Sequence, residues 1–382
     1  MAKIDFVFFD AGGGHRSAAN ALRLAIEREQ RPWEIHLVNL QEILEPLDVF
    51  RKLTGLRLED CYNFLLKKGW TLGSAQLLAF MHLVIRLYHF KQVRLLEGFW
   101  SRSRPDMVVS LVPNFNRAMA ESLAKALPGV PFVTILTDPA DYPPHFWMER
   151  ESQYLICGTG RAVEQARAIG HPDDRIFRTS GMILHPRYYE PEIADRHAER
   201  LRLGLDPELP TALVLFGGQG SSAMIEIARR LDRSRLALQL ILICGRNQEL
   251  RRKLNRLEYR VPHFIEGFTS EVRYYMHLSD FFIGKPGPGS IGEALAMKLP
   301  VIVERNAWTL PQERYNADWV RERQVGLVVP NFRSIGRAVA ELIEPANFAR
   351  FRANAAAIEN RAVFEIPEIL ARLLERHSPG PL

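Results

Sequence analysis

The sequence predicts an α/β protein of two domains, each built on a parallel sheet. At 382 residues and 47% hydrophobic content, the chain is too long for one ordinary core but can bury two cores of domain size. Short apolar runs alternate with amphipathic helical segments, a pattern typical of parallel sheets whose loops gather at the carboxyl ends of the strands. Several of these runs end in glycine-rich loops. We therefore expect ligand chemistry at those strand ends.

The first half of the chain contains five predicted strands. They are expected at 4–9, 35–40, 107–111, 132–137 and 154–157. Helices are expected to begin near residue 15 and to cover 116–126 and 162–169, because apolar side chains recur there at helical spacing. With a basic, aromatic-rich helical insertion at about 50–104, these elements define a first domain at 1–185.

A second α/β domain is predicted at 211–345, after a proline-containing, charged stretch at 186–210 that indicates a linker. Its strands are expected at 211–216, 238–243, 263–265, 281–283 and 300–303. Four consecutive strand ends deliver glycines, a helix cap or a positive side chain to one edge of this sheet, which favours an anionic ligand. The remaining residues, 346–382, are predicted as a helical tail that can return to the first domain.

The stretch SDFFIGKPGPGSIGEALA is the strongest of these signals. Its loop at 284–289 holds three glycines and two prolines, which disfavour a helix, so Ser290 is the expected N-cap of a helix opening at Ile291. Such a loop offers backbone N–H groups beside the positive end of a helix dipole, an arrangement that commonly binds phosphate in proteins. Glu293 lies one turn further, where a carboxylate can accept hydrogen bonds from ribose hydroxyls.

The loop AGGGHR after the first strand is similar to a dinucleotide-binding fingerprint but does not match it. Residues 12–17 have no third glycine at the required spacing, and the second strand ends in Asn39 where an acidic residue would be needed. We therefore set NAD aside. His15, just after three glycines at a helix start, is instead a candidate general base, which the positive helix end would tend to keep unprotonated.

The positive charge of the chain is concentrated in one segment. The net charge is +6, while residues 51–104 alone carry ten Lys or Arg against three acidic residues. These basic residues are interleaved with apolar and aromatic side chains at helical spacing, which indicates an anionic membrane surface as the partner and argues against nucleic acid. The run is too interrupted to span a bilayer. A helical insertion packed on its own domain explains the segment equally well.

The cysteines and the amino-terminal residues indicate a cytoplasmic protein. Cys61, Cys157 and Cys244 are far apart and have no CxxC spacing, so neither a disulfide framework nor a thiolate metal site is indicated. The first residues read as a buried strand and not as a signal peptide, so no export is expected.

Several of these motifs carry a family resemblance. GGGHRSA, ALVLFGGQGSS, ILICGRNQEL, GKPGPGSIGEALAMKLPVIV and PQERYNA, in this order, resemble the family of monogalactosyldiacylglycerol synthases, processive diacylglycerol glucosyltransferases and, more distantly, the lipid II N-acetylglucosaminyltransferase. The resemblance covers residues from about 4 to about 330. It implies the GT-B architecture, in which two Rossmann-like domains face each other across a cleft. The C-terminal domain would take a UDP-sugar, and the N-terminal domain a lipid acceptor such as diacylglycerol.

The resemblance also implies roles for individual residues. The donor would be bound by Gly218, Gln219, Gly220, Ser221, Arg246, Phe268, Thr269, Lys285, Gly287, Gly289, Ser290, Glu293, Gln312 and Glu313. Within that set, Arg246 and Lys285 would neutralise phosphate charge, and Glu293 would bind the ribose. On the acceptor side, next to Gly13 and Gly14, His15 would take the acceptor's proton, and Asp138 is a second candidate for the base or for an orienting group.

The implied reaction is an inverting transfer of a hexosyl group, on the inner face of the cell membrane. No D-x-D or clustered His/Asp/Glu pattern indicates a required metal, and no cofactor is expected beyond the UDP-sugar substrate. One departure leaves the sugar open, because Pro311 replaces the usual glycine before Gln312 and Glu313. Two alternatives remain, a UDP-sugar epimerase of the same fold and a non-catalytic nucleotide-sugar-binding protein on a membrane.

Overall fold

A computed structural model describes residues 1–10, 13–47, 74–191 and 194–377. The expectations for residues 48–73, the first part of the basic segment, lie outside the described residues. The described chain forms two compact units, one of residues 1–47, 74–186 and 360–377 and the other of residues 187–359. Each unit holds one six-stranded sheet, and every strand pairing is parallel. The predicted α/β class with two parallel sheets is confirmed.

The first sheet is built from β1 (Ala2–Phe8), β2 (Trp33–Asn39), β3 (Met107–Ser110), β4 (Phe132–Ile135), β5 (Tyr154–Cys157) and β6 (Ile176–Arg178). Its strand order is β2-β1-β3-β4-β5-β6, so the winding direction changes between β1 and β3. Ligands of such sheets bind outside the carboxyl ends of the strands at that crossover point. The sequence pattern did not reveal β6, because three residues at a half-exposed sheet edge carry little periodicity.

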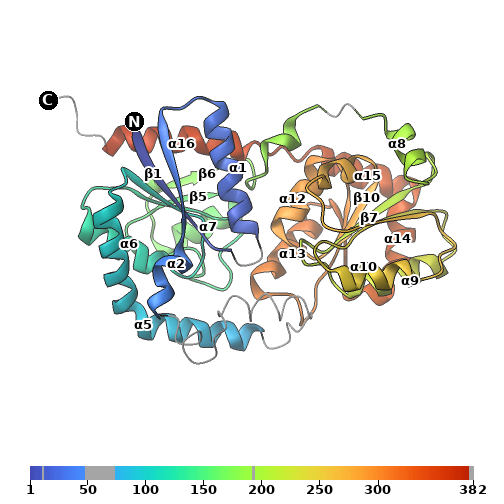
Figure 1. The fold of residues 1–382 in the computed structure, drawn as a ribbon, viewed down its shortest axis with the longest axis horizontal. Helices are drawn as coiled ribbons and strands as arrows, with labels where there is room; N and C mark the ends of the chain where they lie inside the picture. The colour runs from blue at the N-terminus through green and yellow to red at the C-terminus, as the bar shows by residue number, and fades with distance from the viewer. Residues whose placement is uncertain (11–12, 48–73, 192–193, 378–382) are drawn as a thin grey trace. The chain divides into compact units, whose positions relative to one another are not determined.

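Six α-helices belong to the described part of the first unit: α1 (Gly14–Arg28), α2 (Leu40–Leu44), α5 (Ser74–Ser103), α6 (Asn116–Ala126), α7 (Gly160–Ile169) and α16 (Ala362–His377). Helices α5 and α6 pack through Trp100, Leu96 and Met119 against the sheet residues Val7 and Val108. The carboxy-terminal helix α16 returns to this unit and lies against α1 (Figure 1). No helix in the described part of the chain is long and apolar enough to cross a bilayer.

The second sheet contains β7 (Thr211–Leu215), β8 (Gln239–Ile243), β9 (His263–Glu266), β10 (Phe281–Gly284), β11 (Val301–Glu304) and β12 (Gly326–Val329). Its order, β12-β11-β10-β7-β8-β9, is that of a doubly wound dinucleotide-type domain, with the crossover point between β7 and β10. The strands are almost wholly buried runs, as expected for a parallel sheet covered on both faces. The sequence pattern did not reveal β12.

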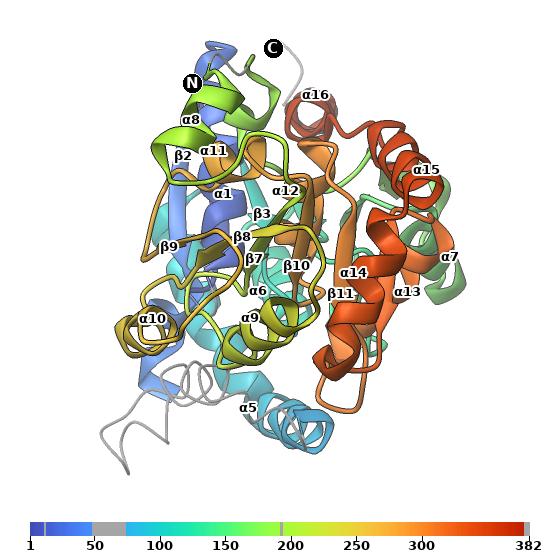
Figure 2. The ribbon, with the colours of Figure 1, turned by 90° about the vertical axis from the view of Figure 1, so that its right-hand side faces the viewer.

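Helices cover both faces of the second sheet (Figure 2). One face carries α9 (Ala223–Arg233), α10 (Gln248–Asn255) and α14 (Ile335–Ile343), which pack on Ala212 and Val214. The other carries α11 (Val272–His277), α12 (Pro288–Ala296) and α13 (Arg314–Glu322), which pack on Leu213 and Leu215. Helix α15 (Pro345–Ala356) contributes Phe351 to the first cluster and Ala355 to the second. The alternation along β7 therefore builds two cores from one strand.

The stretch read as a linker is largely folded into the second unit. It contains the 3-10 turn Pro186–Tyr189 and α8 (Arg196–Arg202), and Tyr188 and Leu205 lie in the core beneath α11 and α12. The buried Arg200 donates to the Asp280 carboxylate at 2.8 Å and to the Leu278 carbonyl at 2.9 Å. Paired charges explain how a polar, proline-rich segment can pack against a domain.

The predicted N-cap of α12 is wrong. The helix begins at Pro288, its N-cap is Gly287, and Ser290 lies inside the first turn. Proline is well tolerated at the first helical position, where its missing N–H would have had no helical partner and its φ is already suitable. The glycines and prolines of residues 284–289 therefore do not prevent the last two of these residues, Pro288 and Gly289, from being helical. Without a capping side chain, the first turn keeps backbone N–H groups available.

Candidate active site

In the first unit, His15 lies at the crossover point of the sheet. It is the second residue of α1, which follows β1, and Gly13 before it adopts the left-handed conformation with φ of 80°. The imidazole Nδ1 lies 3.3 Å from the Thr137 hydroxyl, which follows β4. The Leu111 carbonyl, after β3, accepts a hydrogen bond from the ring. Loops from three adjacent strands thus hold one imidazole.

Burial changes the acid–base chemistry of His15. Removal from water lowers the pKa of His15 to about 4, and the hydrogen bond to the Leu111 carbonyl opposes this shift. From the sequence we expected the helix dipole to keep the ring unprotonated, whereas desolvation is the main cause of the lowered pKa in the structure. At neutral pH the imidazole is therefore uncharged, so one of its two ring nitrogens can take up a proton. The Leu111 carbonyl would stabilise the imidazolium formed when the ring takes up a proton.

Trp147 is a member of this site that sequence reasoning missed. Its ring centroid lies 5.9 Å from that of His15, its side chain is fully buried, and its indole N–H donates to the Asp138 carboxylate at 3.0 Å. Asp141 holds the same residue by accepting the Trp147 backbone N–H at 2.6 Å. Of the two roles predicted for Asp138, this arrangement favours the orienting role. The motif TDPADYPPHFW contained the tryptophan, but only the fold brings its ring to His15.

In the second unit, the loops after β7 and β8 are joined through their main chains. The Arg246 backbone N–H donates to the Gly218 carbonyl at 2.8 Å. Gly245 has φ of 61°, and a Cβ there would lie 2.4 Å from the same carbonyl oxygen. Gly220 is needed for packing as well, because a Cβ there would lie 2.5 Å from the Cys244 carbonyl oxygen. Glycines at these positions permit the close approach of two backbones.

Two cations flank this glycine loop. The Lys285 Cε would lie 4.0 Å from a Cβ built on Gly217, and the Arg246 Nη1 would lie 3.9 Å from one built on Gly218. The Arg246 guanidinium stacks on the ring of Phe268 at 4.1 Å, and that ring is 55% exposed. A glycine turn between a lysine and an arginine, at the crossover point of a parallel sheet, has donors and positive charges of the kind that suit an anionic ligand.

Lys285 also connects this loop to the motif PQERYNA. Its Nζ donates to the carboxylate of the buried Glu313 at 2.8 Å. The Asn316 side-chain amide, buried in α13, donates to the Pro286 carbonyl at 2.8 Å. Gln312 lies in the same 3-10 turn as Glu313 and is partly exposed. The predicted phosphate-binding and sugar-reading residues are therefore neighbours in the structure.

Glu293 has two neighbours that the sequence did not suggest. Burial raises the pKa of Glu293 to about 7, and the Arg187 guanidinium and the Tyr188 hydroxyl act in the opposite direction. The Tyr188 oxygen is buried and makes no hydrogen bond of good geometry among the described residues. Both neighbours come from the stretch read as a linker, so no local pattern pointed to them. A carboxyl group that titrates near neutrality is typical of a binding or catalytic site.

Other predicted site residues serve partly as local structure. The Ser221 hydroxyl accepts the backbone N–H of Ala223 at 3.3 Å and so supports the start of α9. The Thr269 hydroxyl accepts the backbone N–H of Glu271 at 2.9 Å. Gln219 is half-buried in the β7 loop, and Gly14 and Gly289 have nothing within 4 Å of an added Cβ. Their assignment to ligand binding stays a prediction.

Comparison with known proteins identifies the second half of the chain. Residues 211–370 match the family described as glycosyltransferase family 28 C-terminal domain. The match confirms the resemblance read from the motifs.

Curated relatives match the chain along most of its own length, whereas the chain spans only 65% to 80% of theirs. It is 27% identical to monogalactosyldiacylglycerol synthase 1 of Arabidopsis thaliana, over 90% of the chain and 65% of that protein. Acinetobacter baumannii MurG has the same fold at 11% identity, with a TM-score of 0.60 over 97% of this chain and 99% of that one. So does a UDP-N-acetylglucosamine 2-epimerase of Listeria monocytogenes, with a TM-score of 0.63 at 15% identity over 99% and 96%. The two parallel sheets are of the GT-B type.

Proposed function

We propose that the protein transfers a hexosyl group from a UDP-sugar to a hydroxyl of a membrane lipid, with diacylglycerol as the acceptor class. The observation that carries the proposal is the cradle after β7 and β8, in which the glycine turn lies between Lys285 and Arg246. The similarity to a galactolipid synthase supports a lipid acceptor, and the exposed Phe268 ring supports a nucleobase beside the diphosphate.

The proposed reaction is a single displacement with inversion. The neutral imidazole of His15 takes the proton of the acceptor hydroxyl while the acceptor oxygen forms a bond to the anomeric carbon. The bond from that carbon to the diphosphate breaks on the opposite face, and UDP leaves with the electron pair. A positioned base contributes about 10²- to 10⁴-fold, so orientation and charge stabilisation of the departing diphosphate supply the rest. Lys285, Arg246 and the α12 N-terminus are the groups available for that stabilisation, and no metal is required in this scheme.

We place the protein at the inner face of the cell membrane, through helix α5. Leu83, Leu87 and Phe90 recur on one side of this helix and are 53%, 72% and 67% exposed. The exposed Lys91 and Arg94 follow within one turn, which suits an anionic lipid surface. Leu87→Asp is expected to reduce cosedimentation with anionic vesicles several-fold. Leu201→Asp, at a leucine that is 63% exposed in the second unit, is the matched control and is expected to change nothing.

The test of the reaction is a product assay. Labelled UDP-glucose, UDP-galactose and UDP-N-acetylglucosamine would be incubated with the protein and diacylglycerol vesicles, with and without EDTA, and the products identified by mass. We expect one sugar to appear on lipid with its anomeric configuration inverted, and we expect EDTA to have no effect. Conversion of the UDP-sugar without acceptor would instead support the epimerase alternative. Binding of UDP without any turnover would support the non-catalytic one.

A further inference from the structure

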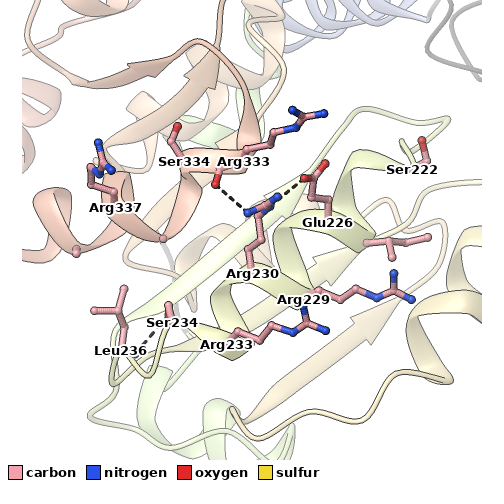
Figure 3. Close-up of a pocket in the computed structure, with 13 residues that line it drawn as sticks. Ser222, Glu226, Arg229, Arg230, Arg233, Ser234, Leu236, Arg333, Ser334 and Arg337 are labelled. Atoms are coloured by element: carbon pink, nitrogen blue, oxygen red, sulfur yellow. Dashed lines mark hydrogen bonds and ion pairs between the residues drawn. The ribbon is translucent and has the colours of Figure 1, made fainter.

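A groove in the second unit lies outside the candidate active site, and five of its thirteen lining residues are arginines. It has a volume of about 890 Å³ and runs between α9 and the segment formed by the 3-10 turn Phe332–Ser334 and α14 (Figure 3). Its arginines are Arg229, Arg230, Arg233, Arg333 and Arg337. Glu226 is the single acidic residue among the described residues that line it. Four guanidinium charges therefore remain without a carboxylate in the wall.

Arg230 is the fixed element of this groove. Its Nε donates to Glu226 at 2.9 Å, and its Nη1 donates to the Arg333 carbonyl at 3.1 Å, so it ties α9 to the turn before α14 (Figure 3). Of the others, Arg233 and Arg337 make no ion pair with any described residue and have exposed side chains. Guanidinium groups held near one another repel, and an anion that bridges them removes this repulsion.

The backbone in the groove favours the same kind of ligand. Ser222 is the N-cap of α9 and Ser334 that of α14, and neither forms a side-chain capping bond. Both serines and Gly336, in the first turn of α14, line the groove. The positive ends of both helices therefore line the groove, as does Ser234, the C-cap of α9, so the arginines and not the helix dipoles give the wall its net positive charge.

We propose that this arginine groove is a binding site for a phosphate-bearing anion, separate from the donor site. The planar guanidinium group of arginine can donate two parallel hydrogen bonds to a pair of phosphate oxygens. Several arginines along an open groove therefore suit a ligand with several phosphate oxygens. Two sources have this chemistry, a soluble polyphosphate-type compound and the headgroup of an anionic phospholipid. The inference goes beyond the proposed transferase activity and does not depend on it.

The test uses the full chain with the donor site saturated by UDP and tripolyphosphate as the soluble probe. Arg233→Gln/Arg337→Gln removes one guanidinium from each side of the groove. Its matched control, Arg252→Gln/Arg323→Gln, removes two exposed arginines of the same unit that lie outside the groove. Both variants lose two charges, so nonspecific attraction falls equally. Thermal unfolding of all three proteins would verify that the fold is kept.

We expect calorimetry to show one tripolyphosphate site, about tenfold or more weaker in the groove variant and within about twofold of the wild type in the control. A second arm measures cosedimentation with phosphatidylcholine vesicles, with and without phosphatidic acid. A loss in the groove variant alone, confined to the phosphatidic acid vesicles, identifies a lipid headgroup; a loss confined to tripolyphosphate identifies a soluble anion. Equal behaviour of the two variants in both arms overturns the proposal. UDP binding is measured separately, so its failure would bear only on the donor site.

Discussion

The two crossover points of this protein solve different chemical problems with the same topology. Between β1 and β3, the first unit presents a side chain, His15, which neighbouring loops partly bury and orient. Between β7 and β10, the second unit presents main chain, a glycine turn pressed against the loop after β8, with cations at its flanks. A site made of a side chain fails when atoms are removed, and a site made of backbone fails when atoms are added.

The largest effect is expected from His15→Ala. Loss of the proposed base should lower kcat by about 10²- to 10⁴-fold, because no other group takes the acceptor's proton. The affinity for UDP, measured by calorimetry, should stay within about twofold, since the donor cradle belongs to the second unit. A parallel loss of UDP binding would show that His15 supports the fold or the donor site and is not the base.

Gly245→Ala tests the opposite sensitivity, because it adds one methyl group. The new Cβ would meet the Gly218 carbonyl oxygen, and the φ of 61° is strained for alanine. We expect UDP affinity to fall by about thirtyfold. Gly204→Ala is the matched control, because Gly204 has φ of 73° but nothing within 4 Å of an added Cβ. If both variants bind UDP equally, the closeness of the two loops does not set the affinity.

The pH dependence of donor binding should follow Glu293. With its pKa raised to about 7, the carboxyl group is mostly protonated at pH 6 and mostly ionised at pH 8. The ionised form accepts hydrogen bonds from ribose hydroxyls, so UDP should bind about tenfold more weakly at pH 6 than at pH 8. Glu293→Gln removes the titration and should leave only the slope due to UDP itself. An unchanged slope in that variant would place the titrating group elsewhere.

The smallest effect concerns the hydroxyl that orients the base. Thr137→Val removes the contact to His15 Nδ1 at 3.3 Å without changing the side-chain volume, and we expect kcat to fall about three- to tenfold. Thr137→Ser keeps the hydroxyl and should restore most of the rate. If Thr137→Ser were slowed as much as Thr137→Val, the hydroxyl alone would not orient the base.

The sequence predicted the strand ends well because buried parallel strands leave a strong local signal. Helix 116–126 and strand 154–157 were predicted with the bounds that the structure shows. Short edge strands such as β6 and β12 were not predicted, since three or four half-exposed residues carry no clear period. The N-cap of α12 was misplaced because proline counted against a helix, although it is favourable at a first helical position.

Only those residues of the candidate site that lie in sequence motifs could be predicted. The glycine turn, Lys285 and Arg246 follow strands and could be located from the pattern. The neighbours that set the chemistry could not, because tertiary contacts bring them in. Trp147 reaches His15 through the turn fixed by Asp141, and Tyr188 reaches Glu293 from a stretch whose composition resembled a linker. The composition of a segment shows how polar it is but does not show which part of the fold it packs against.

The return of α16 to the first unit determines how this protein can be divided. In the described residues the chain passes between the units twice, at 186–187 and at 359–360. Glu365 of α16 accepts the Ser180 backbone N–H at 2.7 Å, and Leu370 and Leu373 of the same helix are fully buried. The family match ends at residue 370, inside this helix. A donor-binding fragment should therefore contain residues 187–359. An amino-terminal fragment ending at residue 186 would lack α16, expose the apolar surface that this helix covers and be prone to aggregate.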